Sequence, residues 1–456
     1  MEPSGFNDST PITDPRQLHD YFTTSCKPKS DWTISTAHEK FPFRLSTQAP
    51  VGYDTPKGIR DLFQVLKIFG WREILEGDNI VGLKRGFASI TCGPGCQVAM
   101  SGAQVKNLHE TAAEIDQHFQ ELKEVAQLLD LGFLGLGCHP TARNEELPRA
   151  PLAVHRIICA AMPLQGKSGL DMMLRTCGIR VTLDYTDEAD MIRKMRVATA
   201  LQPVATALFA ASPFTEGKPN GFQSCRMQLW QDTDSARCGF LPFVFAENFG
   251  FARYIAYAFD APMYYVLRDG KYHDATGQSF GDFMTGKLPA LPGATPTIAD
   301  WHNHLTCLFP DVRLNQNLEM RGADCGTAES ILALPCFWTG LLYDDAACEA
   351  ALNLVQDWTL EEHVALRRDV PQQGLRLSFR GAPLCDIAHK ALRLAQHGLR
   401  RRAIRLHGGA DETRYLDGLF MITESGDSYA DALRMRLENN WQGNILGVFA
   451  DARLQA

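Results

Sequence analysis

The stretch LEMRGAD (Leu318–Asp324) places a carboxylate and a guanidinium two residues apart, at Glu319 and Arg321. In a β-strand, that spacing puts both side chains on the same face. An acid and an arginine that project together into a cleft suit metal–phosphate chemistry. A structural ion pair needs the same two residue types, so the residues alone leave both interpretations open.

A second candidate is TAHEKF (Thr36–Phe41), a short polar segment just after a predicted strand. His38 and Glu39 could act there as acid–base or metal-binding groups. Residues of these types are more often structural, so the pattern by itself does not decide between the two roles.

A third candidate is the polar cluster in SCRMQLWQDTDSARCGFLPF, where charged residues flank an aromatic ring. Guanidinium groups bind carboxylates and phosphates in a bidentate manner. The segment is therefore a candidate for substrate binding, through Arg226, Trp230, Asp234 and Arg237.

The loop TCGPGCQVAMSG (Thr91–Gly102) crowds glycines, a proline and two cysteines together. It matches neither the Walker A pattern nor GxGxxG, which excludes the common phosphate-binding loops. Cys92 and Cys96 have no paired CxxC elsewhere, so a zinc site is not indicated. A tight turn with buried thiols is favoured, and a catalytic thiolate with a nearby base is the alternative.

Composition limits the class of protein. The 456 residues carry a formal net charge of −8, which argues against nucleic-acid binding. No segment reaches the roughly 20 apolar residues of a membrane span, and the N-terminus lacks a secretory signal pattern. The thirteen scattered cysteines indicate reduced thiols. We therefore expect a cytoplasmic protein without nucleic-acid or membrane partners.

The candidate residues need a scaffold, and hydrophobic periodicity predicts a mixed α/β one. We expect one domain over residues 31–456, preceded by a polar leader with a short helix at residues 1–30, and mostly helical from about residue 345. Strands are predicted at Trp32–Ile34 and Ile179–Tyr185, and helices at Gly58–Phe69, Gln104–Leu129 and Glu188–Phe209.

Long runs of the chain resemble the glutamate–cysteine ligases of plants and proteobacteria, the first enzymes of glutathione synthesis. The resemblance extends from about Trp32 to the C-terminus. It is carried by HEKF, EGDNIVGLKRG, GLDMMLRTC, EADMIRKMR, LQPVATALFAASPFTEGKPNG, DAPMYYVLRDGKY, HLTCLFPDVRL, EMRGAD and ALPCFWTGLLYDD.

The resemblance implies a fold like that of glutamine synthetase: a curved, mainly antiparallel sheet that forms a funnel, with helices packed outside. It also implies an ATP- and Mg²⁺-dependent ligase that phosphorylates the γ-carboxylate of glutamate, after which the amine of cysteine attacks the γ-glutamyl phosphate. The expected partners are a glutamate-like amino acid and an amine or thiol acceptor. The expected assembly is a monomer or a homodimer.

Three carboxylates of the family pattern are missing from this chain. The family's GTEHEKF is here STAHEKF, and its LEPGGQFELSG is here CGPGCQVAMSG, so neutral residues stand at Ala37, Gly93 and Ala99. A glutamine of the family is replaced by Arg180. Together these changes raise the net charge of the pocket by about +4, which argues against a multi-metal site and against ordinary ligation.

The remaining positions supply the candidate site. It consists of Glu39 and Glu319 as metal ligands, Arg321, Arg180 and His38 as catalytic groups, and Arg226, Trp230 and Arg237 as substrate-binding groups.

Three functions follow as hypotheses. The first is an ATP-dependent γ-glutamyl ligase with an altered substrate or impaired activity, which would use ATP and Mg²⁺. The second is a repurposed, metal-poor enzyme of specialised metabolism that acts on a glutamyl- or cysteinyl-type compound and needs neither cofactor. The third is a non-catalytic relative that binds a small ligand.

Overall fold

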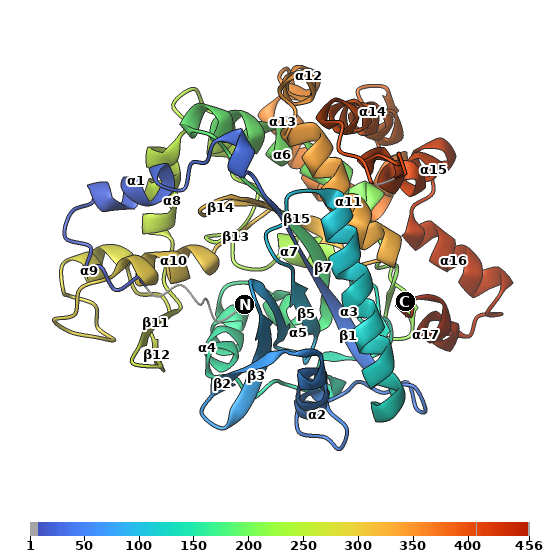
Figure 1. Ribbon diagram of the computed structural model, residues 1–456, viewed down its shortest axis with the longest axis horizontal. Helices are drawn as coiled ribbons and strands as arrows, with labels where there is room; N and C mark the ends of the chain where they lie inside the picture. Colours follow the sequence, from blue (N-terminus) through green and yellow to red (C-terminus); the bar gives the residue numbers. More distant parts are fainter. Residues whose placement is uncertain (1–7, 407, 455–456) are drawn as a thin grey trace.

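The computed structural model describes residues 8–406 and 408–454 (Figure 1). Its centre is a nine-stranded sheet. The strands are β1 (Ile34–Arg44), β2 (Arg72–Glu76), β3 (Asn79–Arg85), β4 (Ala88–Cys92), β5 (Val98–Ser101), β6 (Leu131–Leu134), β7 (Gly178–Leu183), β14 (Val312–Leu314) and β15 (Leu318–Asp324).

Within the sheet, the strands are adjacent in the order β14-β15-β7-β1-β5-β4-β3-β2, and β6 pairs with β1. Each of these pairings is antiparallel. The predicted fold class, a mainly antiparallel sheet with helices outside, is confirmed. Four small two-stranded sheets lie apart from it: β8 (Phe214–Thr215) with β9 (Lys218–Pro219), β10 (Cys238–Gly239) with β13 (Phe309–Pro310), β11 (Tyr265–Arg268) with β12 (Lys271–Asp274), and β16 (Ser378–Phe379) with β17 (Ala382–Pro383).

The helices surround the sheet. They are α1 (Arg16–Thr23), α2 (Ile59–Leu66), α3 (Leu108–Leu129), α4 (Ala153–Ala161), α5 (Gly169–Arg175), α6 (Glu188–Leu208), α7 (Cys225–Gln231), α8 (Phe251–Asp260), α9 (Phe280–Met284), α10 (Ile298–Thr306), α11 (Ala328–Leu342), α12 (Asp345–Val355), α13 (Leu360–Gln373), α14 (Leu384–Arg402), α15 (Asp417–Ser425), α16 (Tyr429–Asn439) and α17 (Val448–Asp451).

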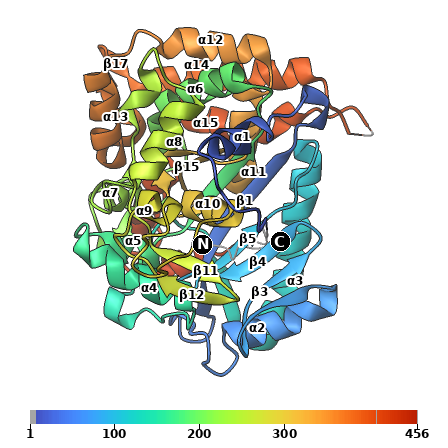
Figure 2. The ribbon, with the colours of Figure 1, turned by 90° about the vertical axis from the view of Figure 1, so that its left-hand side faces the viewer.

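One face of the sheet is covered by helices. The two views in Figures 1 and 2 show α3 and α11 lying along it. α11 packs against β1 and β7, α3 against β1 and β6, and α6 against β15. α6 is buried on nearly all sides because α12 and α13 cover it from outside, and its sequence accordingly lacks a clear polar face. This packing leaves the opposite face of the sheet to form a pocket.

The predicted strand at Trp32–Ile34 is too short. β1 runs from Ile34 to Arg44, and TAHEKF lies inside it rather than after it. Side chains alternate along β1, with Thr36, His38 and Lys40 buried and the residues between them only partly so. β1 carries polar residues on both faces. It therefore lacks the alternation of apolar and polar residues by which a strand is recognised in a sequence.

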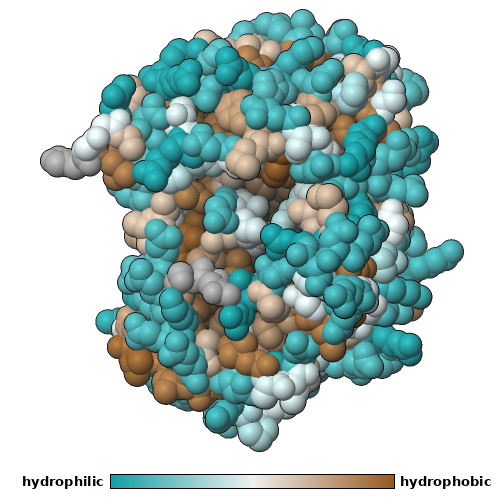
Figure 3. Space-filling view, turned by 90° about the vertical axis from the view of Figure 1, so that its right-hand side faces the viewer, coloured by the Kyte–Doolittle hydropathy of each residue, from teal (hydrophilic) through white to brown (hydrophobic). Residues whose placement is uncertain are grey.

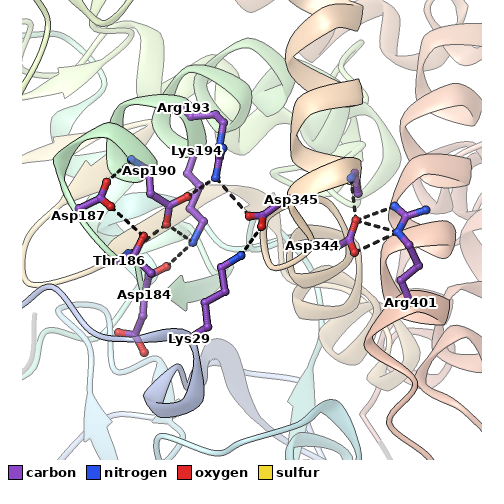
Figure 4. Close-up of polar contacts among 11 residues, drawn as sticks. Lys29, Asp184, Thr186, Asp187, Asp190, Arg193, Lys194, Asp344, Asp345 and Arg401 are labelled. Atoms are coloured by element: carbon purple, nitrogen blue, oxygen red, sulfur yellow. Dashed lines mark hydrogen bonds and ion pairs between the residues drawn. The ribbon is translucent and has the colours of Figure 1, made fainter.

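The segment before β1 is tied to the body by a network of charged groups (Figure 4). Lys194 of α6 contacts Asp190 at 2.8 Å and the carbonyl oxygen of Asp184 at 2.9 Å, and its Nζ lies 3.5 Å from the ring centroid of Trp32. Asp184 in turn accepts hydrogen bonds from Lys27 and from the backbone of Thr33. The leader boundary at residue 30 stays a prediction.

The C-terminal part, from α12 onward, is mostly helical. α14 buries its apolar side and ends in three arginines, of which Arg401 pairs with Asp344 and Arg402 with Glu412. The face that carries the C-terminal helices is largely hydrophilic, with hydrophobic residues in the hollow across its middle and along its lower edge (Figure 3). Among the described residues, no helix is both long and apolar enough to cross a bilayer.

Candidate active site

A cavity of about 390 Å³ opens on the face of the sheet opposite α3 and α11. Its floor is made by alternate residues of six strands: Ser35, Ala37 and Glu39 of β1, Thr91 of β4, Ala99 and Ser101 of β5, Arg180 and Thr182 of β7, Arg313 of β14, and Glu319 and Arg321 of β15. Its walls come from other segments: Gly93, Pro94, Gln97, Met172, Met173, Thr176, Arg226, Trp230, His302, Thr306 and Phe309.

The antiparallel register explains which groups meet on this floor. Ala37 of β1 is directly opposite Arg180 of β7, and Glu39 is opposite Ala99 of β5. Glu319 of β15 lies opposite Thr182 on one side and Arg313 on the other. The charged groups are therefore concentrated on β7, β14 and β15, whereas the β5 side of the floor is lined by small residues.

Glu319 is held by three arginines. Its Oε2 lies 2.5 Å from Arg313 and accepts a hydrogen bond of 2.8 Å from Arg321, while its Oε1 is 3.8 Å from Arg180 Nε. Burial raises the pKa of this carboxyl, but the three guanidinium groups outweigh burial and hold the pKa well below its usual range. Glu319 is therefore ionised across the ordinary pH range.

Glu39 has a similar but weaker set of partners. It accepts hydrogen bonds from the backbone N–H of Gly178 at 2.9 Å and from Arg180 at 3.1 Å. Burial opposes ionisation, but the guanidinium groups of Arg180 and Arg226 keep the pKa of Glu39 below its ordinary value. Arg180 thus lies between both pocket carboxylates.

Arg226 and Trp230 reach the cavity from α7. Arg226 is buried and donates a hydrogen bond of 3.1 Å to the carbonyl oxygen of Arg321. A side chain at Gly178 would place its Cβ 2.5 Å from the Arg226 guanidinium, so only glycine allows this approach. The ring of Trp230 lies 5.8 and 5.9 Å from the guanidinium carbons of Arg226 and Arg321.

Two donors in this wall have no acceptor within the described part of the chain. They are the Nε–H of Arg226 and the indole N–H of Trp230, and both atoms are buried. Buried donors are almost always paired in proteins, so these two donors beside a cavity can bind a ligand or water. The structure thus brings Arg226 and Trp230 together at one cavity, and their predicted role in substrate binding stays a prediction.

Two predicted residues do not reach the cavity. His38 lies on the opposite face of β1 from Glu39, against the rings of His118 and Phe119 of α3, because neighbouring strand residues point in opposite directions. Arg237 is buried elsewhere, where it contacts Asp234 and the carbonyl oxygens of Pro262 and Met263. We correct the assignment of both residues from functional to structural.

Arg313 is a cavity residue that is not among the predicted site residues. It lines the cavity and contacts Glu319 because β14 and β15 pair directly across a short connection. The sequence RLNQNLEMR contains parts of both strands and the short turn between them. The antiparallel pairing of these strands places residue 313 opposite residue 319. Reading the intervening asparagines and glutamine as a turn would have revealed it.

The family model for glutamate-cysteine ligase family 2 (GCS2) matches residues 34–451. The chain belongs to this family. It is 46% identical over 444 residues to glutamate–cysteine ligase B of Oryza sativa subsp. japonica, covering 96% of this chain and 88% of that protein. It is also 46% identical over 431 residues to the glutamate–cysteine ligase of Brassica juncea, covering 94% of this chain and 82% of that protein. Both relatives are described as chloroplastic.

A solved structure has a similar fold. The glutamate–cysteine ligase of Francisella tularensis in complex with AMP matches with a TM-score of 0.55 and 11% sequence identity, covering 92% of this chain and 88% of that one. At this identity the match supports the fold alone. Together with the sequence relatives, it places this chain among proteins with a ligase scaffold.

Ala37, Gly93 and Ala99, the positions where the resemblance predicts carboxylates, all line the cavity. Ala37 and Ala99 are floor positions of β1 and β5, where a longer side chain would point into the cavity. At Gly93, a Cβ would lie 2.6 Å from the side-chain oxygen of Gln97, which would have to move. The predicted loss of three carboxylates stays a prediction, and the residues that it concerns line this cavity.

The residues present do not fit the Mg²⁺ ions that the resemblance implies. Glu39 and Glu319, the two predicted metal ligands, are both engaged by guanidinium groups. A doubly charged ion about 4 Å from a guanidinium would meet a repulsion of roughly 8 kcal/mol at an effective dielectric constant of about 20. Within residues 8–406 and 408–454, no group of three or more His, Cys, Asp or Glu side chains could hold a metal.

Lys40, on the far face of β1, is expected to make stability depend on pH. Its ammonium group is buried 2.8 Å from His118 Nε2, and burial lowers its pKa from 10.5 to about 7. Between these values the unfolded chain binds a proton that the folded chain does not, so stability falls as pH decreases from about 10 to 7. Lys40→Met should remove up to about 1.4 kcal/mol per pH unit from this slope.

Urea denaturation at several pH values between 7 and 10 measures this slope. The exposed Lys84 of β3 is the control, and Lys84→Met should leave the slope unchanged. Equal slopes for wild type and Lys40→Met would show that Lys40 stays charged in the folded protein.

Proposed function

We propose that this member of the glutamate–cysteine ligase family is a carboxylate–amine ligase of the γ-glutamyl type, acting on a glutamate-like amino acid with an altered acceptor. Family membership supports the reaction class. The observation that carries the proposal is the charge of the cavity, where four guanidinium groups surround two carboxylates. Such a lining suits a substrate that brings several negative charges.

In this proposal, an oxygen of the substrate carboxylate attacks the γ-phosphorus of ATP, and ADP leaves with the electrons of the broken P–O bond. The amine nitrogen then attacks the acyl carbon, phosphate leaves, and the amine releases a proton to solvent. The arginines act by neutralising charge: Arg321 and Arg180 face the phosphoryl group, and Arg226 with Trp230 binds the amino acid. Fixed positive groups of this kind lower the barrier because they need no reorganisation.

A metal-poor enzyme that acts on a glutamyl- or cysteinyl-type compound without ATP is the second candidate. It is supported by the position of Arg180, whose guanidinium contacts the two carboxylates that remain in the cavity. In either case the predicted cytoplasmic location and the predicted monomer or homodimer remain to be measured.

ADP release separates the two candidates. Purified protein is given ATP, L-glutamate and a panel of amines and thiols that includes L-cysteine. The ligase proposal expects ADP release that depends on both amino acid and acceptor, and expects Arg226→Ala to lower it by about 10²–10³-fold. No ADP release across the panel would contradict the ligase proposal, and binding without turnover would favour a non-catalytic role.

A further inference from the structure

The side chain of Arg180 occupies an unusual position for an arginine. Its Nη2 donates to Glu39 Oε1 at 3.1 Å, and its Nε lies 3.8 Å from Glu319 Oε1. These carboxylates come from β1 and β15, the two strands that flank β7. A single positive group that joins two acidic side chains across three strands does what a bound cation does in other proteins.

We infer that Arg180 is a built-in substitute for a divalent cation, and that the cavity binds a ligand with two or more anionic groups without a divalent metal. The inference rests on the anionic substrate of the proposed function, but it does not depend on the ligation step. Four arginines and two glutamates line the cavity, which leaves an excess of two positive charges for the ligand to neutralise.

The small residues beside Arg180 support this inference. Ala37 is opposite Arg180 in the strand register, and Ala99 is opposite Glu39. Their methyl groups offer no oxygen ligand to a metal, which requires several. They also leave room beside the guanidinium for an uncharged part of the ligand, bordered by the hydroxyl groups of Ser101 and Thr182.

The buried donors of the wall provide an independent observation. The Nε–H of Arg226 and the indole N–H of Trp230 are both without an acceptor among the described residues. A carboxylate or phosphate oxygen accepts such hydrogen bonds strongly. The class of ligand that fits these features is a compact molecule with two acidic groups, such as an acidic amino acid or a phosphorylated one.

The first test is anion binding in the presence of EDTA, measured by calorimetry with inorganic pyrophosphate as the probe. Wild type should bind it, and Arg180→Gln should bind at least tenfold more weakly. Arg72→Gln on the exposed edge strand β2 is the control that removes a charge far from the cavity. Absence of pyrophosphate binding by wild type, or equal binding by Arg180→Gln, would overturn the inference.

The second test asks whether a metal site returns when the substitute is removed. Mn²⁺ binding is measured by electron paramagnetic resonance for wild type and for Ala37→Glu/Ala99→Glu/Arg180→Gln, with thermal melting to confirm that the variant folds. The variant should bind Mn²⁺ at least tenfold more tightly than wild type. Tight Mn²⁺ binding by wild type that Glu39→Gln abolishes would overturn the inference. Neither test measures ADP, so failure of the ligase proposal is seen separately.

Discussion

Glu319→Gln should lower the free energy of unfolding by about 3–5 kcal/mol, because it leaves buried charges without their partner. The carboxylate contacts Arg313, Arg321 and Arg180, and the two closest contacts are 2.5 and 2.8 Å long. An amide of the same shape cannot neutralise three guanidinium groups. A glutamate that served mainly to hold a metal would behave in the opposite way, since its removal from the metal-free protein relieves repulsion between carboxylates.

Urea denaturation in EDTA measures this effect, and Glu39→Gln is the matched control. Glu39 is more exposed and forms an ion pair with one arginine, so Glu39→Gln should lower the free energy of unfolding clearly less than Glu319→Gln does. The difference in free energy of unfolding between wild type and Glu319→Gln should be largest above the ordinary glutamate pKa of 4.5. It should decrease below that pH, because the pKa of Glu319 is lowered in the folded protein. An unchanged or increased stability would show that the arginines do not depend on Glu319.

The second large effect is expected outside the cavity. Asp190→Asn should also lower the free energy of unfolding by about 3–5 kcal/mol, because Lys194 would remain buried without its counter-charge. Lys194 is only 1% exposed, and burial already lowers its pKa to about 8 despite the carboxylate at 2.8 Å. The variant should therefore melt at a lower temperature and loosen the segment before β1, which contacts Lys194 through Trp32.

The same network contains its own control. Asp345 pairs with Lys29 and Arg193 at the protein surface, where its side chain is 59% exposed. Exposed ion pairs contribute little, so Asp345→Asn should change the free energy of unfolding by less than about 1 kcal/mol. If Asp190→Asn and Asp345→Asn lowered the free energy of unfolding by similar amounts, burial would not determine how much each ion pair contributes to stability.

Much of the fold could be predicted from periodicity. The helices α2, α3 and α6 were expected within a few residues of their observed bounds: α2 and α3 have apolar residues at helical spacing, and α6 is a long run without strand alternation that begins after the N-cap Asp187. β7 was also expected, because IRVTLDY alternates in period two. β1 was only partly found, since both of its faces carry polar residues and neither gives the usual apolar signal.

The site was harder to predict than the fold. The two-residue spacing correctly placed Glu319 and Arg321 together. The same rule, applied to the adjacent His38 and Glu39, would have put them on opposite faces, as is observed. Arg313 reaches the site through the pairing of β14 with β15, which follows only if residues 315–317 are recognised as a turn.

Calorimetric titration of the wild-type protein with a non-hydrolysable ATP analogue, once in EDTA and once with Mg²⁺, tests most directly whether the cavity binds its ligand without a metal. If arginines neutralise the ligand charge in this cavity, binding should occur in both buffers with similar affinity, and Arg180→Gln should weaken binding in EDTA. Binding that requires Mg²⁺ and disappears in Glu319→Gln would contradict the account and would restore a metal site to this pocket.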